Sequence, residues 1–390
     1  MIFYGYTNCS DKKYNEIYHN KNKQVLRADQ KYHSLLIKGL SAHQQVLCLS
    51  PLPINRSISK KFFIHEKDET ENRAKFHYYF TINLPGLRQI MTFFAGFFNV
   101  LMKAKRGTAL ICDYQNISNA CGLLLASKIR RIKSAVIVMD LPAFLTNNTL
   151  VQKIYSYTFH LADSFIFLTE PMNRKVNVNN KSYIVVEGIA DVSRICIMDN
   201  ERYSNTIGKK VVIYAGSLKK IYGIQNLTEG FIKAVIPDSE LWIYGDGDYR
   251  EELEAICEQN PSVIYKGVRS NEEVVSAERK AALLVNPRPS SPEYTKYSFP
   301  SKTMEYMASG TPLLTTRLPG IPAEYNNHLY FIEPAEENAD GIARRLNSIL
   351  KLPEAERQSK GGQAQEFVVK NKSYPVQARR IIDFFQREML

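Results

Sequence analysis

The side chains best suited to chemistry in this sequence lie in one stretch, 286–324, which reads NPRPSSPEYTKYSFPSKTMEYMASGTPLLTTRLPGIPAE. Arg288 and Lys302 supply positive charge, and Glu305 follows three positions after Lys302. Cations beside a helix N-terminus, where backbone N–H groups are free, suit a phosphate group. A carboxylate one turn further along can hold sugar hydroxyls. The residue types alone also allow an ordinary strand–helix–strand unit with solvated charges.

The elements that must position these side chains are a strand, a loop and a helix. The apolar run Ala281 to Val285 predicts a short buried strand, and Pro287 ends it because proline donates no ladder hydrogen bond. Pro300 and Ser301 open a helix, which Gly310 ends. The run 311–316 is the next strand. Strand, helix and strand in this order predict a parallel sheet.

A family resemblance rests on the same stretch. FPSKTMEYMASGTPLLTT followed by LPGIPAEY resembles the donor-binding signature of the retaining glycosyltransferases of family 4, which have the GT-B fold. The resemblance covers roughly residues 205–385 well and the first half weakly. It implies that Glu305 holds the ribose of a nucleotide sugar. The position of a second glutamate, which contacts the transferred sugar in that family, is Tyr297 here.

A glycine turn opens the second half of the chain, where the strand Lys210 to Ala215 runs into Gly216. Glycine permits close approach of the backbone to a ligand. The family has Arg directly after this glycine and Lys six positions after it, to hold the diphosphate; here those positions are Ser217 and Tyr222. Lys219 and Lys220 lie within the turn and are candidate substitutes, as are the two cations of the signature stretch.

A second glycine turn, Gly245-Asp246-Gly247-Asp248, follows the strand 241–244. D-x-D is a metal-binding motif in another class of glycosyltransferase. Its place between a strand and the helix 249–259 favours a phosphate-approach turn with acidic N-capping, so no metal is predicted. The backbone at Val268, after the next strand, is expected to pair with the nucleotide base, as the resemblance implies.

The first half alternates strands and helices from Ala109 onward, which predicts a doubly wound parallel sheet. Ligands bind beyond the carboxyl ends of such strands. Asp113, Asp140 and the pair Thr169-Glu170 occupy such positions, and Asp140 is the best candidate for a sugar contact. The plain alternative for Asp140 is a helix N-cap. His33, on a predicted helix, fits a structural role better than a catalytic one.

The predicted architecture is α/β of the GT-B type, with two Rossmann-like doubly wound domains facing across a cleft. The predicted acceptor-binding domain is 1–191, the linker is 192–207, and the nucleotide-sugar-binding domain is 208–374. The helix 375–390 is expected to cross back onto the first domain, as in the family. Residues 7–27 are predicted to be a long polar loop, and residues 52–73 are poorly patterned.

Composition excludes several classes of protein. The 390 residues are 44% apolar and 23% charged, as in globular proteins. The six cysteines are scattered without a C-x-x-C pair, which favours reduced thiols in the cytoplasm over zinc or disulfides. The start of the chain is not patterned as a signal peptide. The net charge of +12 lies in residues 1–190, with about 25 Lys and Arg against about 12 Asp and Glu. This asymmetry indicates an anionic partner, or else a merely solvated basic face.

One segment leaves two interpretations open. The apolar core Ile90 to Met102 of the segment 84–107 is too short to cross a bilayer. Basic residues flank it: Arg88 before it, and Lys103, Lys105 and Arg106 after it. Such a helix is either buried between sheet layers or lies in a membrane interface.

The predicted function is retaining transfer of a hexose from a nucleotide sugar, UDP-linked, to a saccharide acceptor that is lipid-linked, in cell-surface polysaccharide synthesis. Arg288, Lys302 and the helix start at Ser301 would stabilise the leaving diphosphate. The nucleotide sugar is a co-substrate, and no cofactor or metal is expected. The alternatives are a catalytically inactive partner of another transferase and a nucleotide-sugar epimerase. Nucleic-acid binding is disfavoured because no recognised module is present.

Overall fold

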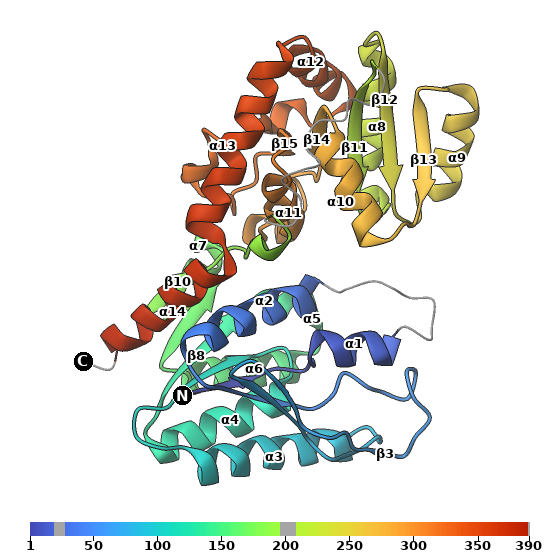
Figure 1. The fold of residues 1–390 in the computed structure, drawn as a ribbon. Coiled ribbons are helices and arrows are strands. Elements are labelled where there is room, and N and C mark those ends of the chain that lie inside the picture. The colour runs from blue at the N-terminus through green and yellow to red at the C-terminus, as the bar shows by residue number, and fades with distance from the viewer. Residues whose placement is uncertain (19–27, 196–207, 389–390) are drawn as a thin grey trace. The chain divides into compact units, whose positions relative to one another are not determined.

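The computed structural model describes residues 1–18, 28–195 and 208–388, which form two compact units (Figure 1). The first unit contains residues 1–189 and 374–390, and the second contains residues 190–373. Ala190 marks the entry to the second unit: it forms a parallel bridge with Ser373, and its N–H donates to the Lys372 carbonyl at 2.8 Å. The chain therefore enters and leaves the second unit side by side. Most of the predicted linker, 196–207, lies outside the described residues.

The sheet of the first unit has eight strands in the order β10-β9-β8-β7-β1-β2-β5-β4. Every neighbouring pair is parallel except β4 with β5. A separate antiparallel pair joins β3 to β6. The strands are β1 (Ile2–Gly5), β2 (Val46–Ser50), β3 (Phe63–Ile64), β4 (Glu69–Glu71), β5 (Ala74–Tyr78), β6 (Thr81–Ile82), β7 (Ala109–Asp113), β8 (Lys133–Val138), β9 (Ser164–Phe167) and β10 (Tyr183–Val185).

Helices cover both faces of this sheet. In Figure 1, α2 lies on one side of the sheet, and α3 and α4 lie on the other. Helix α2 packs against the C-terminal helix α14, and α3 packs against α4. The helices are α1 (Asp11–Tyr18), α2 (Ala28–His43), α3 (Leu87–Lys103), α4 (Ile117–Arg130), α5 (Pro142–Leu145), α6 (Thr149–Leu161), α7 (Glu170–Val176) and α14 (Tyr374–Glu388). The sheet is therefore doubly wound, as predicted, and the last helix returns to the first unit.

The second unit has six strands, all parallel, in the order β13-β12-β11-β14-β15-β16. They are β11 (Lys210–Ala215), β12 (Ser239–Tyr244), β13 (Val263–Gly267), β14 (Leu283–Asn286), β15 (Leu313–Thr316) and β16 (Tyr330–Ile332). The helices are α8 (Ile224–Ala234), α9 (Arg250–Gln259), α10 (Asn271–Lys280), α11 (Ser301–Ser309), α12 (Ala339–Leu350) and α13 (Glu354–Lys372). Short 3-10 turns include η4 (Lys220–Tyr222), η5 (Glu293–Tyr297) and η7 (Pro334–Glu336).

The core of the second unit has two layers because strand side chains alternate between the faces of a sheet. Along β11, Val212 and Tyr214 join the cluster that contains α8 and α12 residues, whereas Val211, Ile213 and Ala215 join the cluster on α11 and α13. Both faces of this central strand are thus buried. Burial on both faces explains why β11 reads as a continuous apolar run rather than an alternating one.

Several elements were missed or misread in the sequence. Helix α1 lies inside the stretch predicted as a loop, because it is strongly polar and buries only Tyr14; residues 19–27 of that stretch lie outside the described residues. Helices α8 and α10 were not foreseen. Nor was α13, which carries Gly361 and Gly362 in its interior and buries small and polar side chains such as Arg357 and Gln365. A helix whose packed face is polar or small gives little apolar periodicity.

Helix α3 settles part of the question left open for the segment 84–107. Its residues Thr92, Gly96 and Val100 are buried against the protein, and the helix packs on α4. Its opposite face is exposed, so the helix is not enclosed between layers. None of the helices in the described part of the chain is long and apolar enough to span a membrane.

Candidate functional site

The strand order marks the carboxyl end of the second sheet as the place where a ligand is expected. From β11 the chain winds through α8 and α9 to β12 and β13, and then returns by α10 to β14 on the other side of β11. The sheet therefore changes winding direction between β11 and β14. Loops that leave such neighbouring strands diverge to opposite faces, and ligands of doubly wound proteins bind in the crevice between them. The predicted chemistry follows these two strands directly.

Helix α11 begins and ends as predicted. Pro300 is its N-cap, and Gly310, with φ of 81°, is the left-handed residue after its end. Tyr306, fully buried, fixes the helix against β11: its hydroxyl accepts from the Ala215 N–H at 2.9 Å and donates to the Ala215 carbonyl at 3.2 Å. Burial raises the pKa of Tyr306 well above its ordinary value, so the hydroxyl stays protonated. This anchor was missed in the sequence, where Tyr306 reads only as a helical aromatic residue.

Lys302 reaches the end of β11. Its ammonium lies so close to Gly216 that a Cβ on residue 216 would meet the Lys302 Nζ at 2.5 Å. The same Nζ lies 5.8 Å from the centre of the Tyr214 ring. The group that approaches Gly216 in this structure is the lysine ammonium, the far end of a flexible side chain, and close approach of a ligand there stays a prediction. The glycine turn and the first turn of α11 therefore meet at one point.

Arg288 lies among aromatic rings. Its guanidinium carbon is 4.6 Å from the ring centre of Tyr222 and 5.7 Å from that of Tyr294. Across the residues that the structure describes, no carboxylate pairs with Arg288. Burial raises the pKa of Tyr214 and of Tyr294, and the nearby Arg288 charge acts in the opposite direction on both. Arg288 thus brings positive charge beside Tyr222. Residue 222 is the position for which the family resemblance implies a lysine.

The loop that carries Arg288 is fixed at both ends. The Ser290 N–H donates to both carboxylate oxygens of Glu337, at 3.1 and 3.0 Å. The Thr295 hydroxyl donates to the Ser290 carbonyl at 2.9 Å. At the η4 turn, a Cβ on Gly223 would come within 2.1 Å of the Pro287 carbonyl oxygen, so the two loops touch. Glu337 carries no motif of its own and could not be assigned from the sequence.

The second glycine turn packs against the first one, and its approach to a phosphate stays a prediction. A Cβ on Gly245 would lie 1.7 Å from the Gly216 carbonyl oxygen, and one on Gly247 would lie 2.4 Å from the Leu218 carbonyl carbon. The Asp248 carboxylate accepts from the Lys220 N–H at 2.8 Å and does not cap α9, whose N-cap is Tyr249. The prediction of acidic N-capping is therefore wrong. These glycines let the two loops pack together, which holds the Gly216 turn in place.

The remaining predicted residues of the β11 and β13 turns are exposed. The Ser217 carbonyl accepts from the Tyr214 hydroxyl at 2.8 Å. The Lys220 ammonium is paired with Glu252 on α9, so its charge is already engaged by a carboxylate. Lys219 is exposed, and Val268 is 65% exposed after the end of β13.

The other residues of the signature lie where the sequence placed them. Ser301 is exposed at the first position of α11, and Glu305 is half-buried one turn further on. Tyr297 is the last residue of η5 and is half-buried. Two nearby polar atoms, the amide nitrogen of Asn286 and the hydroxyl of Thr303, are buried without a hydrogen-bond partner in the described structure. Buried polar groups left unpaired in this way are costly.

Asp140 lies at the matching edge of the first sheet, directly after β8. Its side chain is exposed, its carboxylate accepts from the Gln115 amide at 3.3 Å, and its carbonyl accepts from the Tyr114 hydroxyl. The N-cap of α5 is Leu141, so the plain alternative for Asp140, a helix cap, is wrong. The role of Asp140 toward a sugar stays a prediction.

The other polar candidates of the first unit are occupied by local partners. Asp113 is buried, and its Oδ2 forms a hydrogen bond with the Nε2 of His33 at 3.2 Å. The Nδ1 of His33 lies 2.7 Å from the Tyr4 hydroxyl. Glu170 accepts from Asn173 and Tyr183, both at 3.1 Å, and its neighbour Thr169 is buried. These contacts match the structural interpretation of His33.

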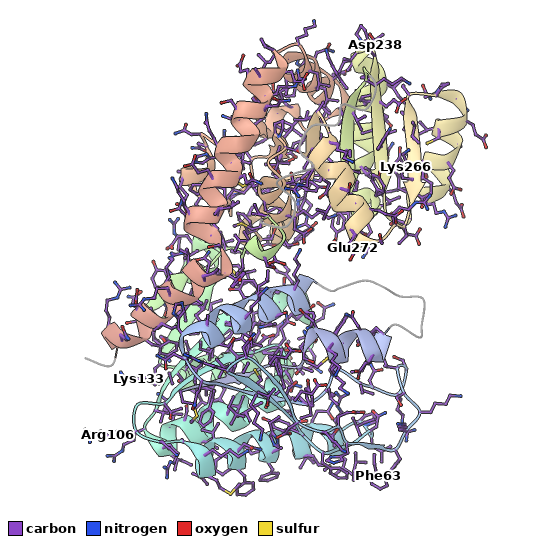
Figure 2. All side chains as sticks on the ribbon, in the orientation of Figure 1. Phe63, Arg106, Lys133, Asp238, Lys266 and Glu272 are labelled. Atoms are coloured by element: carbon purple, nitrogen blue, oxygen red, sulfur yellow. The ribbon has the colours of Figure 1, made fainter. Side chains whose placement is uncertain are left out.

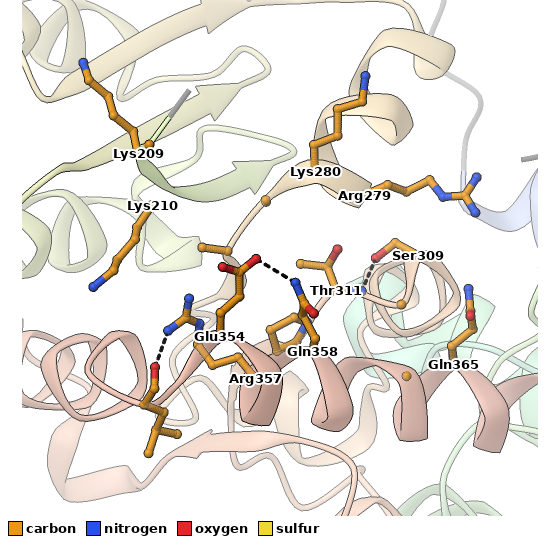
Figure 3. Close-up of a pocket in the computed structure, with 17 residues that line it drawn as sticks. Lys209, Lys210, Arg279, Lys280, Ser309, Thr311, Glu354, Arg357, Gln358 and Gln365 are labelled. Atoms are coloured by element: carbon orange, nitrogen blue, oxygen red, sulfur yellow. Dashed lines mark hydrogen bonds between the residues drawn. The ribbon is translucent and has the colours of Figure 1, made fainter. Parts of the chain in front are cut away.

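A cavity of about 390 Å³ lies at the opposite, amino-terminal edge of the second sheet (Figure 3). Two of its cations bond to backbone carbonyls: Lys210 Nζ donates to the Leu350 carbonyl at 3.0 Å, and Arg357 Nη1 donates to the Leu352 carbonyl at 2.6 Å. Glu354 accepts from Gln358 at 2.7 Å. The cavity lacks the free strand ends of a switch point, so size alone does not make it the candidate site. Within the described ranges, no three His, Cys, Asp or Glu side chains are grouped to hold a metal ion.

Comparisons with known proteins agree with this architecture. Residues 209–351 match the family model of the glycosyl transferases group 1. No curated protein matches the sequence. The sucrose-phosphate synthase structure from Thermosynechococcus elongatus is 15% identical, with a TM-score of 0.65 over 100% of this chain and 99% of that one.

Two further solved structures are similar over nearly their whole length. The E. coli trehalose-6-phosphate structure bound with UDP-2-fluoro glucose is 11% identical, with a TM-score of 0.68 and 99% of both chains covered. The Anabaena HepE structure in complex with UDP is 13% identical, with a TM-score of 0.66 and 99% of both chains covered. At such identities the likeness concerns the fold. The chain therefore has the α/β fold of the GT-B glycosyltransferase structures, as predicted.

Proposed function

We propose that this protein is a retaining glycosyltransferase that moves a hexose from a UDP-linked donor to a saccharide acceptor. The observation that carries the proposal is that Arg288 and Lys302, the latter in the first turn of α11, both act on Tyr214 near the end of β11. The family match over 209–351 and the UDP ligands of the similar structures support a nucleotide-sugar donor.

In the proposed reaction, the bond between the anomeric carbon and the diphosphate oxygen breaks as the acceptor oxygen bonds to that carbon on the same face. The acceptor proton moves to the leaving phosphate oxygen, so charge and atoms balance without a covalent enzyme intermediate. Negative charge grows on the diphosphate as the bond breaks. Arg288 and Lys302 stabilise that charge more in the transition state than in the ground state.

The backbone at the start of α11 adds to this stabilisation. The first N–H groups of a helix have no partner within it, and the helix dipole favours an anion there. Pro300 and Ser301 place that end beside Lys302. Tyr306 holds the helix to the end of β11 through two hydrogen bonds, which keeps these donors fixed before the ligand arrives. Preorganised donors need no rearrangement during the reaction.

Glu305 is assigned to the donor nucleotide. It follows the helix start by one turn, at the distance where the ribose of a bound nucleoside diphosphate would lie if the phosphates sit at Ser301. A carboxylate accepts hydrogen bonds from both ribose hydroxyls. The unpaired buried atoms of Asn286 and Thr303 are further candidates for donor contacts.

The finer parts of the proposal concern the acceptor and its place in the cell. The acceptor is proposed to be a lipid-linked saccharide, and the product a cell-surface polysaccharide or glycoconjugate. The basic first half of the chain supports an anionic acceptor or surface. The reaction is placed in the cytoplasm, at the inner face of the cell membrane, and is proposed to need no metal or cofactor.

The test is turnover of a panel of UDP-hexoses by purified protein, with and without a lipid-diphosphate saccharide, read by mass spectrometry of the products. Lys302→Ala and Glu305→Ala are expected to lose at least about a hundredfold in kcat/KM. Lys233→Ala is the matched control, because this exposed lysine pairs with Asp340 on the second unit's surface. Full activity of both site variants would defeat the assignment.

The same assay separates two other functions. A catalytically inactive partner protein would bind a UDP-sugar without releasing UDP in any combination. Ser217, Tyr222 and Tyr297 stand where the resemblance implies Arg, Lys and Glu, and these replacements favour the inactive partner. The placement of Arg288 over Tyr222 weighs against it. An epimerase would form a new sugar without acceptor.

A further inference from the structure

Helix α3 carries an apolar face that none of the described residues covers. Leu87, Ile90, Phe94, Phe98 and Met102 repeat every three to four residues, and each is at least 40% exposed, with Met102 at 72%. The opposite side of the helix packs on α4. A helix with one buried side and one exposed apolar side has a second, unfilled packing surface.

Three exposed aromatic rings, on and beside the short strands β3 and β6, extend this surface. Phe63 on β3 stacks on Phe80, with ring centres 5.9 Å apart, and meets Phe62 edge-on at 4.9 Å. All three rings are 44–57% exposed. Strand β6, the partner of β3, packs against α3. We call the five α3 residues and these three phenylalanines the apolar face.

Cations lie at both ends of the apolar face. Lys60 and Lys61 precede Phe62, and Lys103, Lys105 and Arg106 follow Met102; all five are exposed. Figure 2 shows Phe63 and Arg106 at opposite ends of α3. The helix itself has no Asp or Glu. The surface therefore combines large apolar groups with positively charged ends, and one carboxylate, Asp68, lies near Lys103.

We propose that the apolar face docks on the surface of an anionic lipid bilayer, with α3 lying in the plane of the interface. Aromatic and aliphatic side chains would enter the boundary between headgroups and acyl chains, and the lysines would reach lipid phosphates. A second copy of the chain is a poorer occupant, because it would bring the same cations face to face. The helix cannot span the bilayer, which agrees with contact at one surface.

This inference deepens the proposed location at the inner face of the membrane by naming the contact surface, and it does not rest on the transfer reaction. The test reads binding rather than turnover, so either idea can fail while the other stands. The full chain is sedimented with vesicles of phosphatidylcholine containing about one-third phosphatidylglycerol, and with vesicles of phosphatidylcholine alone. The wild-type protein is expected to bind the anionic vesicles at least about tenfold more tightly, and added salt is expected to weaken binding.

Two double variants test the two kinds of contact. Phe94→Ser with Phe98→Ser is expected to weaken vesicle binding at least about tenfold by removing apolar area. The control, Val178→Ser with Val235→Ser, removes two exposed apolar side chains elsewhere, 73% and 81% exposed. Because the substituted positions are exposed, each variant is expected to keep the wild-type melting temperature.

The charge variant is Lys105→Gln with Arg106→Gln, expected to weaken binding about twentyfold and to reduce its salt dependence. Arg344→Gln with Lys351→Gln removes the same charge from the exposed surface of α12 and is expected to stay within about twofold of wild type.

A direct probe is Phe98→Trp, read against the single native Trp242 of the second unit as background. Its emission is expected to shift to the blue when anionic vesicles are added. Equal binding by the apolar-face variants and their controls, or no spectral shift, would overturn the proposal. Sedimentation that showed a dimer of the wild-type protein and a monomer of the Phe94→Ser, Phe98→Ser variant would also overturn it. In that case a second copy of the chain would cover the apolar face.

Discussion

The two sheets of this protein change winding direction at equivalent places, yet the two places are built differently. In the first unit the change lies between β1 and β7, where Tyr4, His33 and Asp113 form a buried chain of hydrogen bonds. In the second unit it lies between β11 and β14, where Arg288 and Lys302 follow the strands. Topology alone would mark both as ligand sites.

The difference shows how side chains decide which crevice remains available. The first is filled by the protein's own groups: Tyr4, His33 and Asp113 are all buried, and the polar atoms of His33 and Asp113 are paired. The second holds a guanidinium that no described carboxylate neutralises. Both places contain buried polar atoms without partners: Tyr6 and Thr7 after β1, and Asn286 at the end of β14. Changes in the second crevice should therefore alter ligand chemistry, whereas changes in the first should alter stability.

The largest effect is expected at Arg288. Arg288→Gln removes a cation from the proposed diphosphate site and is expected to lower kcat by about a hundred- to a thousandfold. Arg288→Lys keeps the charge but loses the planar group that stacks on Tyr222, so an intermediate loss is expected. Steady-state kinetics of UDP release measures both. Arg250→Gln, at an exposed pair with Glu254, is the control, and equal losses there would contradict the comparison.

The next effect tests whether the second glycine turn serves packing. Gly245 has φ of 127°, and an added Cβ would meet the Gly216 carbonyl oxygen at 1.7 Å. Gly245→Ala is expected to lower the free energy of unfolding by about 3 kcal/mol or more. Gly267→Ala is the control: its φ of 71° is also positive, but nothing lies within 4 Å of the new Cβ, so about 1 kcal/mol is expected. Denaturant titration that gave equal losses would contradict this packing role.

A smaller effect tests the crevice of the first unit. His33→Phe leaves the buried Asp113 carboxylate without its partner, and a loss of about 2 kcal/mol in the free energy of unfolding is expected. Turnover by the folded variant is expected to stay within about threefold of wild type. His43→Phe changes an exposed histidine of the same helix and should leave stability within about 0.5 kcal/mol. A loss of turnover without a loss of stability would make His33 catalytic instead.

The smallest effect concerns the anchor of α11. Tyr306→Phe removes a hydroxyl that pairs with both backbone groups of Ala215, so the Ala215 N–H would be left buried and unpaired. A loss of about 1–2 kcal/mol in stability and a weaker affinity for UDP are expected. Thermal denaturation with and without UDP measures both. Tyr330→Phe on β16 is the control. Equal changes in stability and in UDP affinity in the two variants would show that Tyr306 does not support the site.

Much of the fold was predictable because its strands are apolar runs separated by helices with clear end signals. Pro300 and Gly310 correctly predicted where α11 begins and ends. Helix α1 was missed because it buries only Tyr14, and α13 because its packed face is small and polar. The exposed side of α3 could not be told from a buried one in the sequence, because it carries the large apolar residues, whereas the buried side carries the smaller Thr92, Gly96 and Val100.

The site was predictable only in part. Arg288, Lys302 and Glu305 stand close together in the sequence and carry a recognisable spacing. Glu337 and Tyr306 support the site through hydrogen bonds to backbone groups, which leave no motif. Lys220 was a reasonable phosphate candidate by position, but its pairing with Glu252 depends on how α9 packs beside the turn.

The most direct test is a crystal structure with a bound UDP-hexose. The account predicts the diphosphate within hydrogen-bonding distance of the Lys302 Nζ and of the first N–H groups of α11, with the ribose at Glu305. Nucleotide density at the amino-terminal cavity of the second sheet, or a diphosphate distant from both cations, would contradict it.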